Sequence, residues 1–164
     1  MVALASRDDL EHGIGLLRTL LLSGIESHLV VRSDTALALG DELADVRALA
    51  TQVYSHENQA ARISSGSFLT RGMIVVPCDG ASVGAIVMGL ATNLVHRAAD
   101  VTLKEARPLV LGVRPDVLAA VPADVLDRAA AVPGLVLVPL AKSVEDSVPA
   151  LLAQLGSDGA LVAA

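Results

Sequence analysis

Short apolar runs rich in β-branched residues alternate along this chain with longer segments of helical periodicity. The five runs span residues 2–5, 28–31, 73–77, 109–113 and 135–139. Each run is about five residues long and apolar on both faces, which is typical of a buried strand. Strands separated by helices require crossover connections, and right-handed crossovers give an open parallel sheet covered on both faces. The alternation therefore predicts a three-layer α/β, Rossmann-like domain with a parallel sheet.

The segments between these runs carry helix signals. Residues 10–22 place leucines at positions 10, 16, 17, 20 and 21, close to the recurrence that makes one apolar helix face. Asp34 is expected to cap a helix over residues 34–50, because its carboxylate can accept the N–H groups of the first turn. Further helices are expected over residues 81–89 and from Ser143 to Leu155.

The composition fits a single domain over residues 1–156, followed by a short tail over residues 157–164 that is expected to be a mobile end or an oligomer contact. Hydrophobic residues make up 53% of the 164, but there is one Phe, one Tyr and no Trp, so Ala, Val, Leu and Ile must form the core. Only 18% of the residues are charged. So much apolar surface on a chain of this length predicts a homo-oligomer.

Charge and targeting signals argue against several classes of protein. The formal net charge of −6 argues against a nucleic-acid groove, which needs clustered Lys and Arg. No apolar stretch reaches roughly 18 residues, so no membrane span is expected. The N-terminus lacks the apolar run of a signal peptide, and the lone Cys78 cannot form an internal disulfide. We therefore expect a cytoplasmic protein.

Metal and thiol chemistry are not expected. The histidines, at positions 12, 28, 56 and 96, lie in different segments without metal-ligand spacing. Cys78 is the sort of residue that is buried behind a strand end. Ligands of open α/β sheets bind outside the carboxyl ends of the strands. The loops after residues 5, 31, 77 and 113 are therefore the candidate site.

Three motifs identify a known family. Residues 63–68 read Ile-Ser-Ser-Gly-Ser-Phe, residues 71–78 read Arg-Gly-Met-Ile-Val-Val-Pro-Cys, and residues 97–105 read Arg-Ala-Ala-Asp-Val-Thr-Leu-Lys-Glu. Together they resemble the flavin prenyltransferase family, also called UbiX, over about residues 2–155 and most densely from Ile63 to Arg114. The resemblance implies a flavoprotein-like fold and an enzyme that joins a dimethylallyl group to FMN, whose product serves a UbiD-type decarboxylase. It also implies trimers that assemble into a dodecamer.

The resemblance assigns candidate site residues by position. It implies FMN contacts at Ser6, Arg32, Ser65, Gly66, Ser67, Asp79, Gly80, Ser82 and Arg114. It implies catalytic roles for Glu42 and Lys104. The loop over residues 64–68 would reach the flavin of a neighbouring subunit, with Gly66 permitting a close approach and Phe68 anchoring it. From the residues alone, Lys104 also fits an ordinary ion pair on a helix surface.

Both phosphate-binding turns depart from the family pattern. The first reads Ala5-Ser6-Arg7-Asp8-Asp9 where the family has a glycine-rich turn, and residues 79–82 read Asp-Gly-Ala-Ser where the family has Ser-x-Lys/Arg-Thr. A carboxylate close to a phosphate is unfavourable unless it is neutralised. In a purely structural interpretation, Asp8 and Asp9 begin the first helix and Asp79 caps another. Arg32 stands where the family has Ser and could supply the cation that Ala81 does not.

The prenyl-binding end departs further. Pro115 stands where the family has a proton-handling Glu, and Asp116 is the nearest carboxylate that could replace it. The family's Phe-Tyr-His segment is missing, and Gln154 takes the place of a phosphate-binding Arg. Lys142 is the only nearby cation in the sequence.

Three hypotheses follow from these patterns. The leading one is a divergent flavin-prenyltransferase-like flavoprotein that is related to the supply of prenylated FMN to a UbiD-type decarboxylase and whose phosphate-binding motifs for FMN are altered. The alternative is a non-catalytic homologue that acts as a binding or assembly subunit with a UbiD-type decarboxylase or an active paralogue. In the third, Asp8, Asp79 and Arg32 suit a cationic or zwitterionic small molecule.

Overall fold

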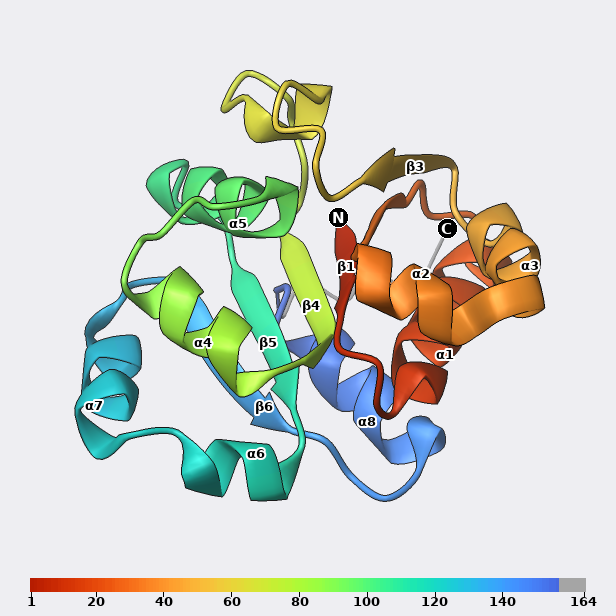
Figure 1. Cartoon of the computed structure of the whole chain (residues 1–164). Coiled ribbons are helices and arrows are strands. Elements are labelled where there is room, and N and C mark those ends of the chain that lie inside the picture. The colour runs from red at the N-terminus through yellow and green to blue at the C-terminus, as the bar shows by residue number, and fades with distance from the viewer. Residues whose placement is uncertain (157–164) are drawn as a thin grey trace.

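A computed structural model describes residues 1–156, and the proposed tail over residues 157–164 lies outside the described residues. Six parallel strands form one sheet with the order β3-β2-β1-β4-β5-β6 (Figure 1). The strands are β1 (Val2–Ala5), β2 (His28–Val31), β3 (Gln52–Ser55), β4 (Met73–Cys78), β5 (Leu109–Val113) and β6 (Leu135–Pro139). All five predicted strands are present, and the predicted α/β class with a parallel sheet is confirmed.

The sixth strand, β3, was not predicted. It lies at the edge of the sheet and pairs with β2 alone, from His28 opposite Gln52 to Val31 opposite Ser55. Its side chains are exposed or half-buried. An edge strand needs little apolar character, because only one side of it meets a neighbouring strand, so the sequence pattern of buried strands does not detect it.

Helices connect the strands. They are α1 (Leu10–Leu22), α2 (Ser33–Leu39), α3 (Leu43–Ala48), α4 (Gly80–Val87), α5 (Leu94–Lys104), α6 (Pro115–Ala120), α7 (Ala123–Ala131) and α8 (Val144–Ala153), with short 3-10 turns η1 (Gly40–Glu42) and η2 (Arg62–Ser64). The single helix predicted over residues 34–50 is wrong, because the chain breaks at Gly40, whose φ of 50° ends α2. Asp34 is not the N-cap of α2. The helix begins at Ser33 after Arg32, and the Asp34 carboxylate pairs with the Arg32 side chain.

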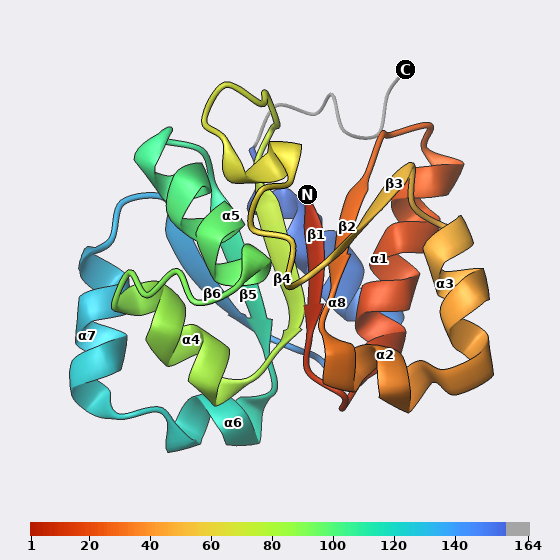
Figure 2. The same cartoon turned by 45° about the horizontal axis from the view of Figure 1, so that its top comes forward.

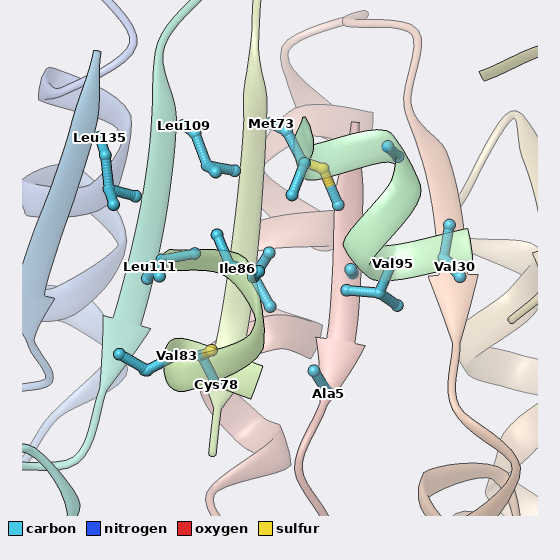
Figure 3. Close-up of a cluster of buried hydrophobic side chains, with 14 of the residues drawn as sticks. Ala5, Val30, Met73, Cys78, Val83, Ile86, Val95, Leu109, Leu111 and Leu135 are labelled. Atoms are coloured by element: carbon cyan, nitrogen blue, oxygen red, sulfur yellow. The ribbon is translucent and has the colours of Figure 1, made fainter. Parts of the chain in front are cut away.

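Helices cover both faces of the sheet (Figures 1 and 2). The first face packs α1 and α8 against each other and carries the buried Leu39 of α2 and Val46 of α3, while α4, α5 and α7 cover the second face. Alternate residues of β1 divide between the two cores: Val2 and Leu4 join the first, and Ala3 and Ala5 the second. Figure 3 shows the second core, where aliphatic side chains from the strands meet those of α4 and α5.

Two glycines let α1 lie close to its neighbours. A Cβ on Gly13 would lie 2.6 Å from the backbone oxygen of Val76 in β4, and a Cβ on Gly15 would lie 2.2 Å from a methyl group of Val144 in α8. Both distances are too short for a side chain. The Gly-x-Gly pattern inside the first helix therefore serves helix packing.

The strand order reverses between β1 and β4, which are neighbours although they are far apart in sequence. In open α/β sheets the crevice at such a reversal, outside the carboxyl ends of the strands, is the usual ligand position. The turns after Ala5 and Cys78 flank this crevice. Among the described helices, none combines the length and apolarity that a membrane crossing requires.

Candidate functional site

Arg32 follows β2 and links α2 to α4. Its Nε donates to Asp34 at 2.9 Å and its Nη2 contacts the second oxygen of the same carboxylate. Its Nη1 donates to Asp79 at 2.5 Å and contacts Ser82 Oγ at 3.4 Å. Hydrogen bonding from Arg32 lowers the pKa of Asp34 to about 2, so this carboxylate stays ionised. The guanidinium is therefore held between two negative charges.

Asp79 follows β4 and caps α4. Its Oδ1 accepts the backbone N–H of Ser82 at 2.7 Å, while its Oδ2 accepts from Arg32. The cap predicted from the sequence is thus confirmed. Free N–H groups at a helix N-terminus are what an external phosphate would bind. In this chain the Asp79 carboxylate already fills that position, directly beside Gly80 and Ser82.

Arg114 follows β5 and is surrounded by carboxylates. Its Nε and Nη2 donate to Asp116 at 2.9 and 2.5 Å, and its side chain lies 3.4 Å from an oxygen of Asp9 and 3.7 Å from one of Asp8. Hydrogen bonding to Asp116 raises the pKa of Arg114. Arg114 and its aspartates form a second charged cluster at the carboxyl ends of the strands, beside the cluster around Arg32.

Ser6 lies in the turn between β1 and α1. Its Oγ accepts the backbone N–H of Asp8 at 3.2 Å, and its carbonyl accepts from Thr35 Oγ1 at 3.2 Å. Asp9 precedes α1 in a left-handed conformation with φ of 56°, and its side chain makes no capping hydrogen bond. Asp8 and Asp9 therefore lie just before α1, as expected, but their carboxylates face Arg114 and Asp9 does not cap the helix through its side chain.

The carboxyl edge does not fit a flavin phosphate. The ion pairs there join two arginines to five aspartates, and these seven side chains carry a formal charge of −3, while Arg7 of the same turn is exposed. Each guanidinium is engaged by at least two carboxylates, and the helix N-terminus that could hold an anion is already capped. A phosphate would have to displace Asp79 or lie among carboxylates, both of which are unfavourable.

The other candidate residues lie away from these clusters. Arg107 donates to the carbonyls of Phe68 at 2.8 Å and Gly66 at 2.9 Å, which fixes the loop over residues 64–68 near the amino edge of the sheet. Within this loop, Ser65 Oγ lies 2.8 Å from Ser67 Oγ. Arg107 was not predicted as a site residue, although it lies only two residues after the third family motif.

Phe68 anchors the loop, as expected. Its ring meets His28 edge to face at 4.9 Å, and the Arg62 guanidinium lies over it at 4.9 Å. His28 also stacks on Tyr54, so the only Phe and Tyr of the chain lie in one cluster. This cluster belongs to the amino edge of the sheet, the edge opposite the Arg32 and Arg114 clusters.

Neither expected catalytic residue joins the arginine clusters within the described chain. Glu42 is exposed in η1. Lys104 ends α5 and pairs with Asp100 at 2.7 Å, as an ordinary helix-surface pair would. Lys142 and Gln154, which the family resemblance relates to prenyl-phosphate binding, are exposed. Cys78 is buried as predicted, and burial raises the pKa of its thiol.

A cavity of about 520 Å³ opens beside Arg32, and we call it the His96 cavity. Its lining residues are Arg32, Ser33, Asp34, His56, Ala81, Ser82, Ala85, Asn93 and His96. His96 is only 8% exposed, and its Nε2 has no hydrogen-bond partner among the described residues. His96 was not predicted as a site residue, because it directly precedes the third family motif and the histidines show no metal-ligand spacing. A cavity of this size is within the range of small-molecule sites.

Residues 11–121 match the family model described as Flavoprotein. A flavin prenyltransferase UbiX from Deinococcus radiodurans is 41% identical over 120 residues, which are 71% of this chain and 62% of that protein. The chain thus spans somewhat less than two thirds of the length of this relative.

Two solved structures are also similar. A dodecameric FMN-dependent UbiX-like decarboxylase from Escherichia coli has a TM-score of 0.79 at 34% identity, covering 94% of this chain and 89% of its own. AnUbiX in complex with FMN and dimethylallyl pyrophosphate has a TM-score of 0.77 at 33% identity, and the alignment covers 98% of this chain and 89% of the AnUbiX chain.

Proposed function

The chain belongs to the flavoprotein family as a divergent UbiX-type member, and on this premise we propose that it serves a prenylated-flavin system as a binding or assembly subunit. In this role it keeps the fold of the flavin prenyltransferases without joining a prenyl group to FMN itself. Its partner would be a UbiD-type decarboxylase, or an active paralogue that supplies prenylated FMN to such a decarboxylase.

One observation carries the proposal: the Asp79 carboxylate fills the anion position at the N-terminus of α4. It accepts from Ser82 N–H at 2.7 Å and from Arg32 at 2.5 Å. Prenyl transfer to FMN requires a site for the flavin phosphate and a second site for the prenyl phosphate. The carboxylates around Arg32 and Arg114 oppose the first, and the exposed Gln154 offers no charge to the second.

An assembly role agrees with what the chain retains. The loop over residues 64–68 is held by two hydrogen bonds from Arg107. Leu22 and Leu69 are 87% and 83% exposed and line a hollow of about 1090 Å³ near this loop. Apolar surface of this kind favours contact with another subunit. The dodecameric relative supports a homo-oligomer, which we propose for this chain as well.

A second candidate function is prenyl transfer to FMN in a complete oligomer. The solved complex of AnUbiX with FMN and dimethylallyl pyrophosphate favours it, because that chain is 33% identical to this one in an alignment that covers 98% of this chain. Glu42 is exposed and Lys104 is 68% exposed, so both are available to a neighbouring subunit. In this alternative the two residues would be catalytic, FMN would be the cofactor, and Ser6, Arg32 and Arg114 would contact it.

Incubation with FMN and dimethylallyl phosphate separates the two candidates. A binding or assembly subunit should give no prenylated flavin by absorbance or mass, yet sediment as an oligomer and co-purify from its native source with a decarboxylase or a paralogue. A relative that forms prenylated FMN, assayed in parallel, provides the positive control. Prenylated product from the purified chain alone would refute the proposal, and so would a chain that sediments as a monomer without partners.

A further inference from the structure

The loop over residues 64–68 is held from behind by two residues that are distant from it in the sequence. The first is Arg107, between α5 and β5, whose guanidinium donates to the backbone carbonyls of Phe68 at 2.8 Å and Gly66 at 2.9 Å. Its side chain is only 14% exposed and lies 3.8 Å from the Glu105 carboxylate, which balances its charge. Hydrogen bonds from a charged donor are stronger than neutral ones. One cation that is largely shielded from solvent therefore fixes the backbone of the loop.

The second residue, His28, holds the one aromatic side chain of the loop. Its ring is buried and meets the Phe68 ring edge to face at 4.9 Å. Its Nε2 lies 3.0 Å from a Glu26 oxygen, and its Nδ1 lies 3.0 Å from the Tyr54 hydroxyl. Because a carboxylate only accepts, Nε2 carries a proton, and Nδ1 of the neutral ring accepts from Tyr54. These two contacts fix the plane of the imidazole, so the ring meets Phe68 in one orientation.

Exposed side chains mark the outward side of this segment. Ser65, Ser67 and Leu69 are exposed, and the two serine hydroxyl oxygens lie 2.8 Å apart. The amides of Ser65 and Phe68 donate within the segment, to the carbonyls of Arg62 and Ser65. Ordering a loop when it binds costs conformational entropy and weakens association. A loop that is already ordered avoids most of that cost.

We propose that Arg107 and His28 are positioning residues for subunit assembly, which hold the loop over residues 64–68 in its binding conformation and act on the partner only through it. The partner is a second copy of this chain. This role rests on the proposed function, which gives the chain a homo-oligomer. It adds that the affinity between subunits depends on two shielded residues behind the contact surface.

Hydrogen exchange of the full chain, followed by mass spectrometry, tests whether the two residues order the loop. Arg107→Lys keeps the charge but loses the planar fork that serves both carbonyls. His28→Leu removes the ring. Each variant should speed exchange over residues 61–69 about tenfold, with exchange in β1 and β4 unchanged. His28→Phe should restore most of the protection, because a phenyl ring keeps the edge contact.

Two matched controls separate this role from general packing. Arg128→Lys changes an exposed arginine on α7, and His12→Gln changes a histidine that is 4% exposed and bonds to the Ala141 carbonyl near the opposite edge of the sheet. Neither should alter exchange in the loop. Sedimentation equilibrium should show an oligomer dissociation constant raised about tenfold by Arg107→Lys and by His28→Leu, but not by His12→Gln, even where that variant lowers stability to urea.

Each result has a distinct meaning. Loop exchange that is unchanged in both variants overturns the positioning role, and so does a looser loop with an unchanged dissociation constant. A wild type that sediments as a monomer overturns the proposed oligomer instead, and the exchange rates alone then decide whether the two residues order the loop. If Arg107→Lys or His28→Leu does not fold, Phe68→Leu decides, because it removes the ring contact from the side of the loop. Equal loop exchange in Phe68→Leu and the wild type overturns the role of His28.

Discussion

Replacing Asp79 with Ser and Ala81 with Lys should create an FMN phosphate site in this chain. Asp79 caps α4 through Ser82 N–H, and Ser is an equally good N-cap, so the helix should remain intact. Ala81 is exposed in the first turn of α4 and lines the His96 cavity, so a lysine there can reach it without being buried. The exchange removes one negative charge, adds one positive charge and releases Arg32 Nη1 from Asp79.

The expected gain follows from the contacts that become available. A charge-assisted hydrogen bond contributes about 1.5–3 kcal/mol, which corresponds to roughly ten- to a hundredfold tighter binding. Flavin fluorescence titration measures it. The gain should appear for FMN and not for riboflavin, and it should shrink at high salt because the site is open to solvent. Ala81→Gln serves as the uncharged control for the added side chain.

Two results would refute this reasoning. Tight FMN binding by the wild type would mean that the fold neutralises the phosphate elsewhere, and Arg32 and Arg114 would be the first side chains to truncate. An equal gain for riboflavin and FMN would mean that the substitutions act on cavity shape rather than on charge. Should neither wild type nor variant bind FMN, the turn over residues 6–8 is the stronger block, and the non-catalytic role gains support.

Two further predictions concern stability. Gly13→Ala should lower the free energy of unfolding by about 1–3 kcal/mol in urea denaturation, because the added Cβ would meet the Val76 backbone and force α1 away from the sheet. Gly84→Ala in α4 is the control. A Cβ at Gly84 would have nothing within 4 Å, so this variant should be neutral or stabilising. An equal loss in both variants would contradict the packing argument. The lowered pKa of His96 means that the unfolded chain takes up a proton first as the pH falls below about 6.5, so stability is fully present above that pH and is lost below it. Urea denaturation at pH 7.5 and pH 5.5 should show this loss of stability in the wild type and a smaller loss in His96→Gln. An identical loss in both proteins would mean that His96 is not its source.

The fold was largely predictable because buried parallel strands are apolar at consecutive positions. All five such runs are strands, and α1 has the predicted bounds. The edge strand β3 was missed because edge pairing needs few apolar residues. The break at Gly40 was missed because the helical signals of α2 and α3 run on through that position.

The candidate site was predictable only where a motif marks it. The sequence placed Arg32, Asp79 and Arg114 at strand ends, and the parallel sheet brings those ends to one edge. It did not predict that Arg32 and Asp79 neutralise each other, since 47 residues separate them and their contact depends on strand order. His96 was missed for a related reason. Its unpaired Nε2 is a property of the folded surroundings and leaves no trace in the neighbouring residues.

The Asp79 carboxylate can be regarded as a competitor that the chain carries within itself. Even a short flexible tether gives a bound group a local concentration in the millimolar range, and Asp79 is additionally held by Arg32 and Ser82. An anion from solution must displace this internal occupant before it can reach α4. Replacement of Asp79 alone would remove this internal occupant, while the sheet and its helices stay as they are.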